Sequence, residues 1–209
     1  MPPHLSARLR FISLPLPTVD GLPEGAESTA DVPAEKIELL KKAMDGLAAP
    51  LAAFLADRAA ADRRPDWIVH DFCHHWVPPI ADEHNVPSAA FLIVHAAFVA
   101  FLGPRWANVA HPRASTEDFA VPPAWIPSPS TIAYRRRSEA EWMVGAFRAN
   151  ASGVSDMDRV WGMFERCSLT IYRSCDEVDP GMFALLSDLL RKPAVPSGVL
   201  LPPVIRRRP

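Results

Sequence analysis

The residues best suited to chemistry lie in the stretch 66–76, which reads Asp-Trp-Ile-Val-His-Asp-Phe-Cys-His-His-Trp. Residues 67–69 form a short apolar run of aromatic and β-branched residues, which predicts a buried strand. The prolines at 78–79 fall where the first turn of a following helix tolerates them. Asp71 is therefore expected at the carboxyl end of a strand, the edge at which open parallel α/β sheets bind their ligands.

A carboxylate in this position has two interpretations, which the residues alone leave open. Asp71 would either cap the predicted helix, since Asp is a preferred N-cap residue, or serve as a catalytic group. His70, Cys73, His74 and His75 surround it and invite a third interpretation as metal ligands. Adjacent histidines point away from each other on a helix, and no second cluster supplies the ligands that a closed zinc site needs. No metal is therefore predicted.

The chain as a whole alternates predicted strands with predicted helices. Strands are expected at 9–14, 66–71, 88–93, 131–134, 168–172 and 194–200, and helices at 34–49, 51–61, 78–85, 96–107, 139–149, 156–165 and 180–190. Prolines make 110–129 an expected irregular loop, and Asp179 is the expected cap of the last helix. This order predicts an α/β fold with a parallel sheet and helices on both faces.

The composition of the chain limits its partners. The 209 residues are 49% hydrophobic and 22% charged, with a net charge of −2, which argues against a nucleic-acid or membrane-surface partner. The three cysteines lack a metal or disulfide spacing, as is usual in a reducing compartment. The apolar stretch 89–102 is too short to span a bilayer, and residues 1–10 lack the apolar core of a signal peptide. We therefore expect a cytoplasmic protein without a membrane span or an obligate protein partner.

Several segments resemble the plant UDP-sugar-dependent glycosyltransferases of family 1, which have the GT-B type of fold. The branch that they resemble most glycosylates flavonoids, terpenoids and glycosides that already carry a sugar. The resemblance rests on residues 66–76, 81–87 (Ala-Asp-Glu-His-Asn-Val-Pro), 21–29 (Gly-Leu-Pro-Glu-Gly-Ala-Glu-Ser-Thr), 45–47 with Pro50, 174–177 (Ser-Cys-Asp-Glu) and 200–203. It extends from about residue 8 to residue 203, nearly the whole chain.

The resemblance implies the incomplete amino-terminal half of a GT-B fold. Residues 1–200 would form a Rossmann-like, acceptor-binding domain without its first strand–helix unit, and residues 201–209 would begin the interdomain linker. The family transfers a sugar from a UDP-sugar to a hydroxyl of a small plant metabolite, with inversion and without a metal or other cofactor. Its general base is a His paired with an Asp, and Asp71 occupies the position of that Asp. The His and the nucleotide-sugar signature have no counterpart in this chain.

Three histidines are expected to bind substrate. His74 and His75 are placed at the start of the helix, either near the acceptor cleft or only capping the helix. His95 follows the 88–93 strand, where the family usually has a small or hydroxyl residue near the donor sugar, and it would either line the cleft or be a satisfied core or rim histidine. Two interpretations of the chain stay open, so its own status as an enzyme is not decided. It is either a fragment of an inverting UDP-glycosyltransferase or a catalytically inactive product that at most binds a small apolar molecule. An α/β hydrolase is disfavoured, because the sequence has no Gly-x-Ser-x-Gly elbow.

Overall fold

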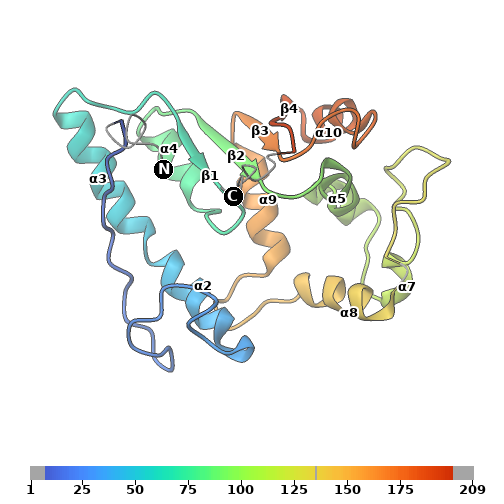
Figure 1. Ribbon diagram of the computed structural model, residues 1–209, viewed down its shortest axis with the longest axis horizontal. Helices are drawn as coiled ribbons and strands as arrows, with labels where there is room; N and C mark the ends of the chain where they lie inside the picture. Colours follow the sequence, from blue (N-terminus) through green and yellow to red (C-terminus); the bar gives the residue numbers. More distant parts are fainter. Residues whose placement is uncertain (1–7, 135, 200–209) are drawn as a thin grey trace, which may run out of the picture.

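The computed structural model describes residues 8–134 and 136–199. Its centre is a parallel sheet in the strand order β1-β2-β3-β4 (Figure 1). The strands are β1 (Ile68–His70), β2 (Ser88–Leu92), β3 (Leu169–Tyr172) and β4 (Ala194–Pro196). The predicted parallel α/β class is confirmed, and each of these four predicted strands forms with shorter bounds. The predicted linker at 201–209 lies outside the described residues.

Helices that precede the strands build the main core. These are α4 (Val77–Glu83), α9 (Asp156–Arg166) and α10 (Met182–Leu190). α4 and α9 pack against β2 and against each other, whereas α10 packs against β4 and α5 (Ala96–Leu102). Phe101, Met163 and Tyr172 are almost fully buried there. Burial of such a side chain stabilises the fold by about 1.5–3 kcal/mol, so packing holds α5 and α9 beside the sheet.

The remaining helices lie on two sides of this core (Figure 1). On the amino-terminal side are the 3₁₀ helix η1 (Ala34–Lys36), α2 (Ile37–Asp45) and α3 (Ala48–Ala60). On the other side are α6 (Arg105–Ala110), α7 (Thr116–Phe119) and α8 (Arg137–Ala146). The boundary predicted at Pro50, between the helices 34–49 and 51–61, lies instead at residues 46–47, and Pro50 falls in the first turn of α3, where proline is tolerated.

Two expected strands are corrected by the structure. Residues 9–14 are described but have no regular secondary structure, and Phe11 among them is 87% exposed. Residues 131–134 also form no strand; instead the Tyr134 N–H donates to the Phe119 carbonyl. The residue types fit a strand in both segments, but a strand needs a neighbour on which to pair and pack, and the sheet in the described part offers neither segment one.

The helix expected at 96–107 is interrupted after α5. Gly103 has φ 69°, and a Cβ there would lie 2.4 Å from the Trp125 ring. Such a left-handed residue followed by Pro104 ends α5 and begins α6. The proline-rich stretch 110–129 is irregular as expected, except for α7, where Ser115 and Asp118 form a capping box.

The sheet is unevenly covered within the described residues. His70 and Tyr172 are buried, whereas Val69 and Val195, which point to the opposite face, are 62% and 39% exposed. The prediction that the apolar run 67–69 is a buried strand is therefore wrong for its burial, because this face of the edge strand β1 is left uncovered in the described part of the chain. β1 lies at one edge of this sheet and pairs only with β2 among the described residues. The loop that follows β1 therefore begins at this edge of the sheet.

Candidate functional site

Asp71 begins the loop between β1 and α4. Its Oδ1 accepts hydrogen bonds from the Cys73 backbone N–H at 3.1 Å and from His74 Nδ1 at 2.7 Å. The bond from Cys73 closes an Asx turn, in which an Asp side chain binds the backbone two residues further on. The Asp71 side chain is still 55% exposed. The carboxylate is thus anchored through one oxygen while much of the group remains open to solvent.

The helix-cap interpretation of Asp71 is wrong. The N-cap residue of α4 is Trp76, which makes no side-chain cap bond, and Pro78 lies in the first turn. The His74 ring instead packs edge-on against Trp76, with ring centroids 5.5 Å apart. Asp71 therefore stabilises the turn before the helix and orients His74, which rests on Trp76.

The electrostatics keep Asp71 charged. The hydrogen bond from His74 is the main cause that lowers the pKa of the Asp71 carboxyl below its usual value, and the charge of His74 and the Cys73 amide add to it. Partial burial acts in the opposite direction. His70, which ends β1, has a lowered pKa chiefly because it is desolvated. The site therefore pairs a carboxylate with neighbours that favour its anionic form.

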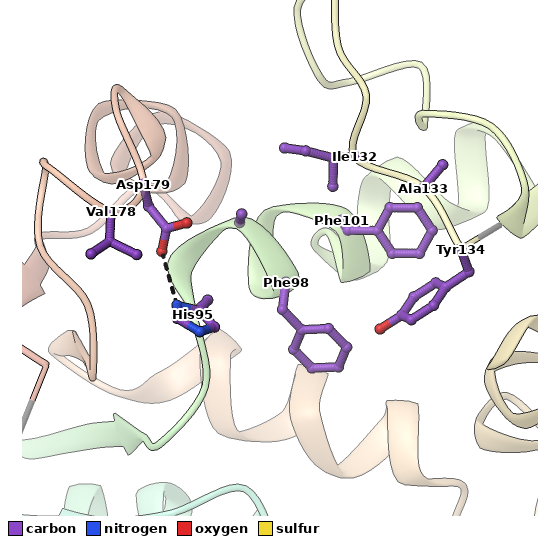
Figure 2. A pocket seen from close by; sticks show the side chains of 9 residues that line it. His95, Phe98, Phe101, Ile132, Ala133, Tyr134, Val178 and Asp179 are labelled. Carbon is purple, nitrogen blue, oxygen red and sulfur yellow. Dashed lines mark ion pairs between the residues drawn. The ribbon is translucent and has the colours of Figure 1, made fainter. Parts of the chain in front are cut away.

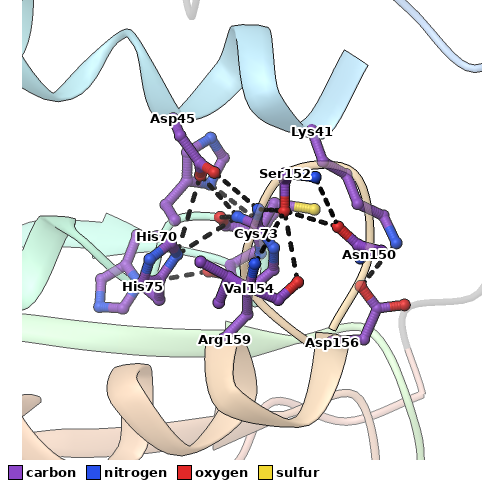
Figure 3. A network of polar contacts seen from close by, with 12 residues as sticks. Lys41, Asp45, His70, Cys73, His75, Asn150, Ser152, Val154, Asp156 and Arg159 are labelled. Atoms are coloured by element: carbon purple, nitrogen blue, oxygen red, sulfur yellow. Dashed lines mark hydrogen bonds and ion pairs between the residues drawn. The ribbon is translucent and has the colours of Figure 1, made fainter. Parts of the chain in front are cut away.

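His75 belongs to a different set of contacts from its neighbour His74. Its Nδ1 lies 3.3 Å from the Arg159 guanidinium and 3.9 Å from Asp45 Oδ1 (Figure 3). Burial, and then the positive charge of Arg159, lower the pKa of His75. His75 thus belongs to a polar network between α2 and α9 that favours its neutral form, while His74 binds Asp71.

His95 is the N-cap residue of α5 and lies after β2, at the same edge of the sheet as Asp71. Its side chain is 65% exposed, and its Nδ1 lies 3.8 Å from Asp179 Oδ2. Asp179 is buried and accepts hydrogen bonds from the Ala96 N–H, at 2.8 Å, and from the Ser174 hydroxyl. The expectation that Asp179 caps its own helix is wrong: Gly181 is the N-cap residue of α10, and Asp179 binds the start of α5.

A cavity of about 420 Å³ opens beside His95. Figure 2 shows His95 and Asp179 at one end and aromatic rings at the other. The wall consists mainly of Phe98, Phe101, Ile132, Tyr134 and Val178. The volume lies within the usual range of small-molecule sites, which are mostly apolar with a few polar groups.

A buried arginine shapes the aromatic end of this cavity. Arg113 stacks over the rings of Phe101, Phe119 and Trp125 and donates to the Leu102 carbonyl at 2.8 Å. Burial lowers the pKa of Arg113 to about 10, which leaves it cationic at neutral pH. Trp125 donates to the Ala100 carbonyl, so the proline-rich segment is fixed on α5.

The four expected site residues fall into three groups. Asp71 and His74 pair directly, His95 pairs with Asp179, and His75 joins the Arg159 network. Sequence reasoning missed the roles of Asp179 and Arg159. Both residues bind partners that are more than 80 residues away in the sequence. The sequence offered one usable signal, which is that Asp179 follows a predicted strand and so falls at the carboxyl edge of the sheet. In the described ranges, no group of three or more His, Cys, Asp or Glu side chains is placed to hold a metal.

The fold and the site define an α/β domain with a polar carboxyl edge and an apolar cavity beside it. A solved structure, Arabidopsis thaliana UGT89C1, matches this fold with a TM-score of 0.59 and 20% identity, over 94% of this chain and 38% of that chain. The match falls on the amino-terminal half of that GT-B structure.

Sequence comparison leads to the same family. The chain is 39% identical over 202 residues to UDP-glycosyltransferase 91C1 and 40% identical over 206 residues to UDP-glycosyltransferase 91B1, both from Arabidopsis thaliana. These matches cover 97% and 95% of this chain but 42% and 43% of the relatives. The resemblance to the plant UDP-glycosyltransferases is confirmed, and the chain spans about 40% of the length of the curated relatives. No family model matches the chain.

Proposed function

We propose that this chain forms the acceptor-binding part of an inverting UDP-glycosyltransferase. The enzyme would transfer a sugar from a UDP-sugar to a hydroxyl of a small plant metabolite, such as a flavonoid or a terpenoid glycoside. The observation that carries the proposal is the Asp71 carboxylate, anchored through Oδ1 at the carboxyl end of β1 and 55% exposed. The sequence similarity to UDP-glycosyltransferases supports this role.

The proposed reaction needs a general base. A hydroxyl is a weak nucleophile until a base such as His removes its proton in the transition state. A carboxylate bound to the second ring nitrogen of that His fixes the tautomer and stabilises the imidazolium. Asp71 is suited to this task because its pKa is lowered and its exposed side can accept a further hydrogen bond. A base at this site requires no metal and no cofactor, and the UDP-sugar would be the donor substrate.

The acceptor would occupy the cavity beside His95. Phe98, Phe101 and Tyr134 supply apolar and aromatic contacts, which suit a flat, ring-containing molecule. His95 is the exposed polar group at the other end, where it would bind a hydroxyl of the acceptor or of the donor sugar. We assign His74 to the rim of the site beside Asp71, and His75 to its support.

The proposal also covers the extent of the domain and the location of the protein in the cell. Residues 1–200 would act as the acceptor domain, with a linker from residue 201. Among the helices in the described ranges, none has the length and apolar character needed to cross a bilayer. The cytoplasm remains our proposed location because the cysteines of the chain, Cys73, Cys167 and Cys175, are free.

A fusion enzyme tests this proposal. We define the completed enzyme as this chain joined to the segments of UDP-glycosyltransferase 91C1 that it does not span. It would be supplied with UDP-glucose and a panel of flavonols and terpenoid glycosides, and the linkage of the product determined by NMR. We expect a glucoside with inverted anomeric configuration. Retained configuration, or hydrolysis of the donor without any glycoside, would contradict the proposal.

A second candidate is binding of a small apolar molecule without transfer. The cavity favours it, because all its lining residues belong to this chain. Two measurements together separate sugar transfer from binding alone. The first is a titration of the 209-residue chain with a flavonol, in which binding is detected by tryptophan fluorescence, and the second is the transfer assay with the completed enzyme. Binding by the chain and no transfer by the completed enzyme would establish the second candidate.

A further inference from the structure

Arg159 is the most deeply buried charged residue among the described residues, with only 1% of its side chain exposed. It lies on α9 and forms a two-pronged ion pair with Asp45, the last residue of α2, at 2.5 and 2.6 Å. Its Nη2 also donates to the Ser152 hydroxyl at 2.8 Å. The planar guanidinium is suited to such a site because its fork of N–H groups matches a carboxylate and still has donors to spare.

The spare donors of Arg159 reach the loop that carries Asp71. Nη1 lies 3.4 Å from the carbonyl oxygen of Cys73 and 3.3 Å from Nδ1 of His75. Figure 3 shows Asp45 on α2 and Arg159 on α9 facing each other, with the Cys73 and His75 segment between them. Residues from two helices distant in sequence thus meet on one short loop after β1.

The same loop residue contacts Asp71. The Cys73 carbonyl accepts from Arg159, and the Cys73 N–H donates to Asp71 Oδ1 at 3.1 Å. A displacement of Cys73 would therefore move the amide that orients the Asp71 carboxylate. His75, held by Arg159, also fixes the backbone next to His74, which is the second donor to Asp71.

We propose that Arg159 and Asp45 are positioning residues for the reaction. Their ion pair holds Cys73 and His75, so that the loop presents the Asp71 carboxylate in one fixed orientation. The inference rests on the proposed role of Asp71 in sugar transfer. It adds a dependence of that role on α2 and α9, which do not contribute to the His95 cavity.

The neighbouring ion pair provides a matched control. Lys41 of α2 pairs with Asp156 of α9 at 2.5 Å, so it joins the same two helices as Asp45 and Arg159. The Lys41–Asp156 ion pair does not include a residue of the 71–76 loop. A Lys41→Met variant thus weakens the attachment of α2 to α9 while it leaves the contacts of Cys73 and His75 in place.

The test measures the loop directly in the 209-residue chain. Amide hydrogen exchange of residues 72–76 would be followed by mass spectrometry, and the Asp71 carboxyl titrated by carbon-13 NMR. In Arg159→Lys, which keeps the charge but loses the planar fork, we expect exchange in the loop to accelerate at least about tenfold through local opening. The Asp71 titration should move to higher pH. Asp45→Asn should act in the same direction, and Lys41→Met should change neither measurement.

The outcomes test the positioning role of Arg159 separately from the proposed role of Asp71 in sugar transfer. Unchanged loop exchange and unchanged Asp71 titration in folded Arg159→Lys would overturn the positioning role, and so would equal changes in Lys41→Met. If Arg159→Lys does not fold, Ser152→Ala decides in its place, because it removes one hydrogen-bond partner of Arg159, on a partly buried turn, and leaves the ion pair with Asp45 intact. In the completed enzyme, the positioning variants should lower kcat more than they raise the acceptor KM. Full transfer by Asp71→Asn would instead overturn the proposed function and leave the loop result intact.

Discussion

Nδ1 of His74 lies 2.7 Å from Oδ1 of Asp71, three residues away in the loop after β1. The same oxygen accepts the Cys73 amide, so two donors anchor one oxygen of a carboxylate that is otherwise half exposed. This geometry distinguishes Asp71 from a helix cap. It also makes His74, which the sequence placed near the acceptor, the main cause of the lowered pKa of Asp71.

Replacement of His74 should raise the pKa of Asp71. In His74→Phe the ring keeps its packing against Trp76 but loses the hydrogen bond that is the main cause of the lowered pKa. A folded-state pKa below the unfolded value stabilises the protein above the unfolded pKa, and this stabilisation is lost as pH falls through the folded pKa. We expect the acid-unfolding midpoint of His74→Phe at higher pH. Since Asp71 is exposed, the loss at neutral pH should be about 1 kcal/mol or less. An unchanged Asp71 titration by carbon-13 NMR would refute this.

Asp179 should be a large contributor to stability. Asp179→Ala leaves the Ala96 N–H and the Ser174 hydroxyl without their buried acceptor. Each of these two unsatisfied groups costs about 1–3 kcal/mol, so the free energy of unfolding should fall by roughly 2–6 kcal/mol. Urea denaturation measures this, with the exposed Asp176→Ala as control. Equal stability of the two variants would show that Asp179 does not hold the start of α5.

The cavity beside His95 should bind a flat aromatic molecule. Ala97→Arg places a long charged side chain in the lining of this cavity, at a partly exposed position on α5. We expect flavonol affinity, measured by fluorescence titration, to fall at least about tenfold, a change of about 1.4 kcal/mol. Ala124→Arg, in the exposed loop outside this cavity, should bind as the parent does. An equal loss of affinity in both variants would show that the flavonol does not bind in the cavity beside His95.

The edge strand β1 should promote self-association of the 209-residue chain. Val69 is 62% exposed on a strand that has one neighbour in the described sheet, and such edges pair with other chains. Val69→Lys should reduce oligomers and precipitate, because an edge lysine opposes pairing. Light scattering after size exclusion would measure this, with Val121→Lys, exposed in a loop, as control. A monomeric parent chain would contradict the prediction.

The sequence was most informative where a pattern depends on near neighbours. The apolar runs of β1 and β2 and the proline-led α4 are all short-range signals, and each formed where expected. Residues 9–14 have the same local pattern without a sheet partner in the described part, so they do not form a strand. Local pattern cannot supply the neighbour that a strand requires.

The site was predictable in part for the same reason. The position of Asp71 at the end of β1 was predictable because it follows an apolar run, and its contact with His74 is local. Asp179 binding to Ala96 and Arg159 binding to Asp45 join segments 83 and 114 residues apart. Each of these carboxylates has an acceptable local role, as a helix cap or a solvated charge, and only tertiary packing selects the distant partner.

Sugar transfer by Asp71→Asn tests the central claim most directly. Asn keeps the shape of Asp71 and its ability to accept the Cys73 amide, but it lacks the charge that a protonated His needs. In the completed enzyme, with the exposed Asp57→Asn as control, single-turnover transfer from UDP-glucose would be compared with the parent. We predict a loss of at least about a hundredfold, the low end for general acid–base catalysis, with a melting temperature within a few degrees of the parent. Transfer at the parental rate by Asp71→Asn would contradict the account.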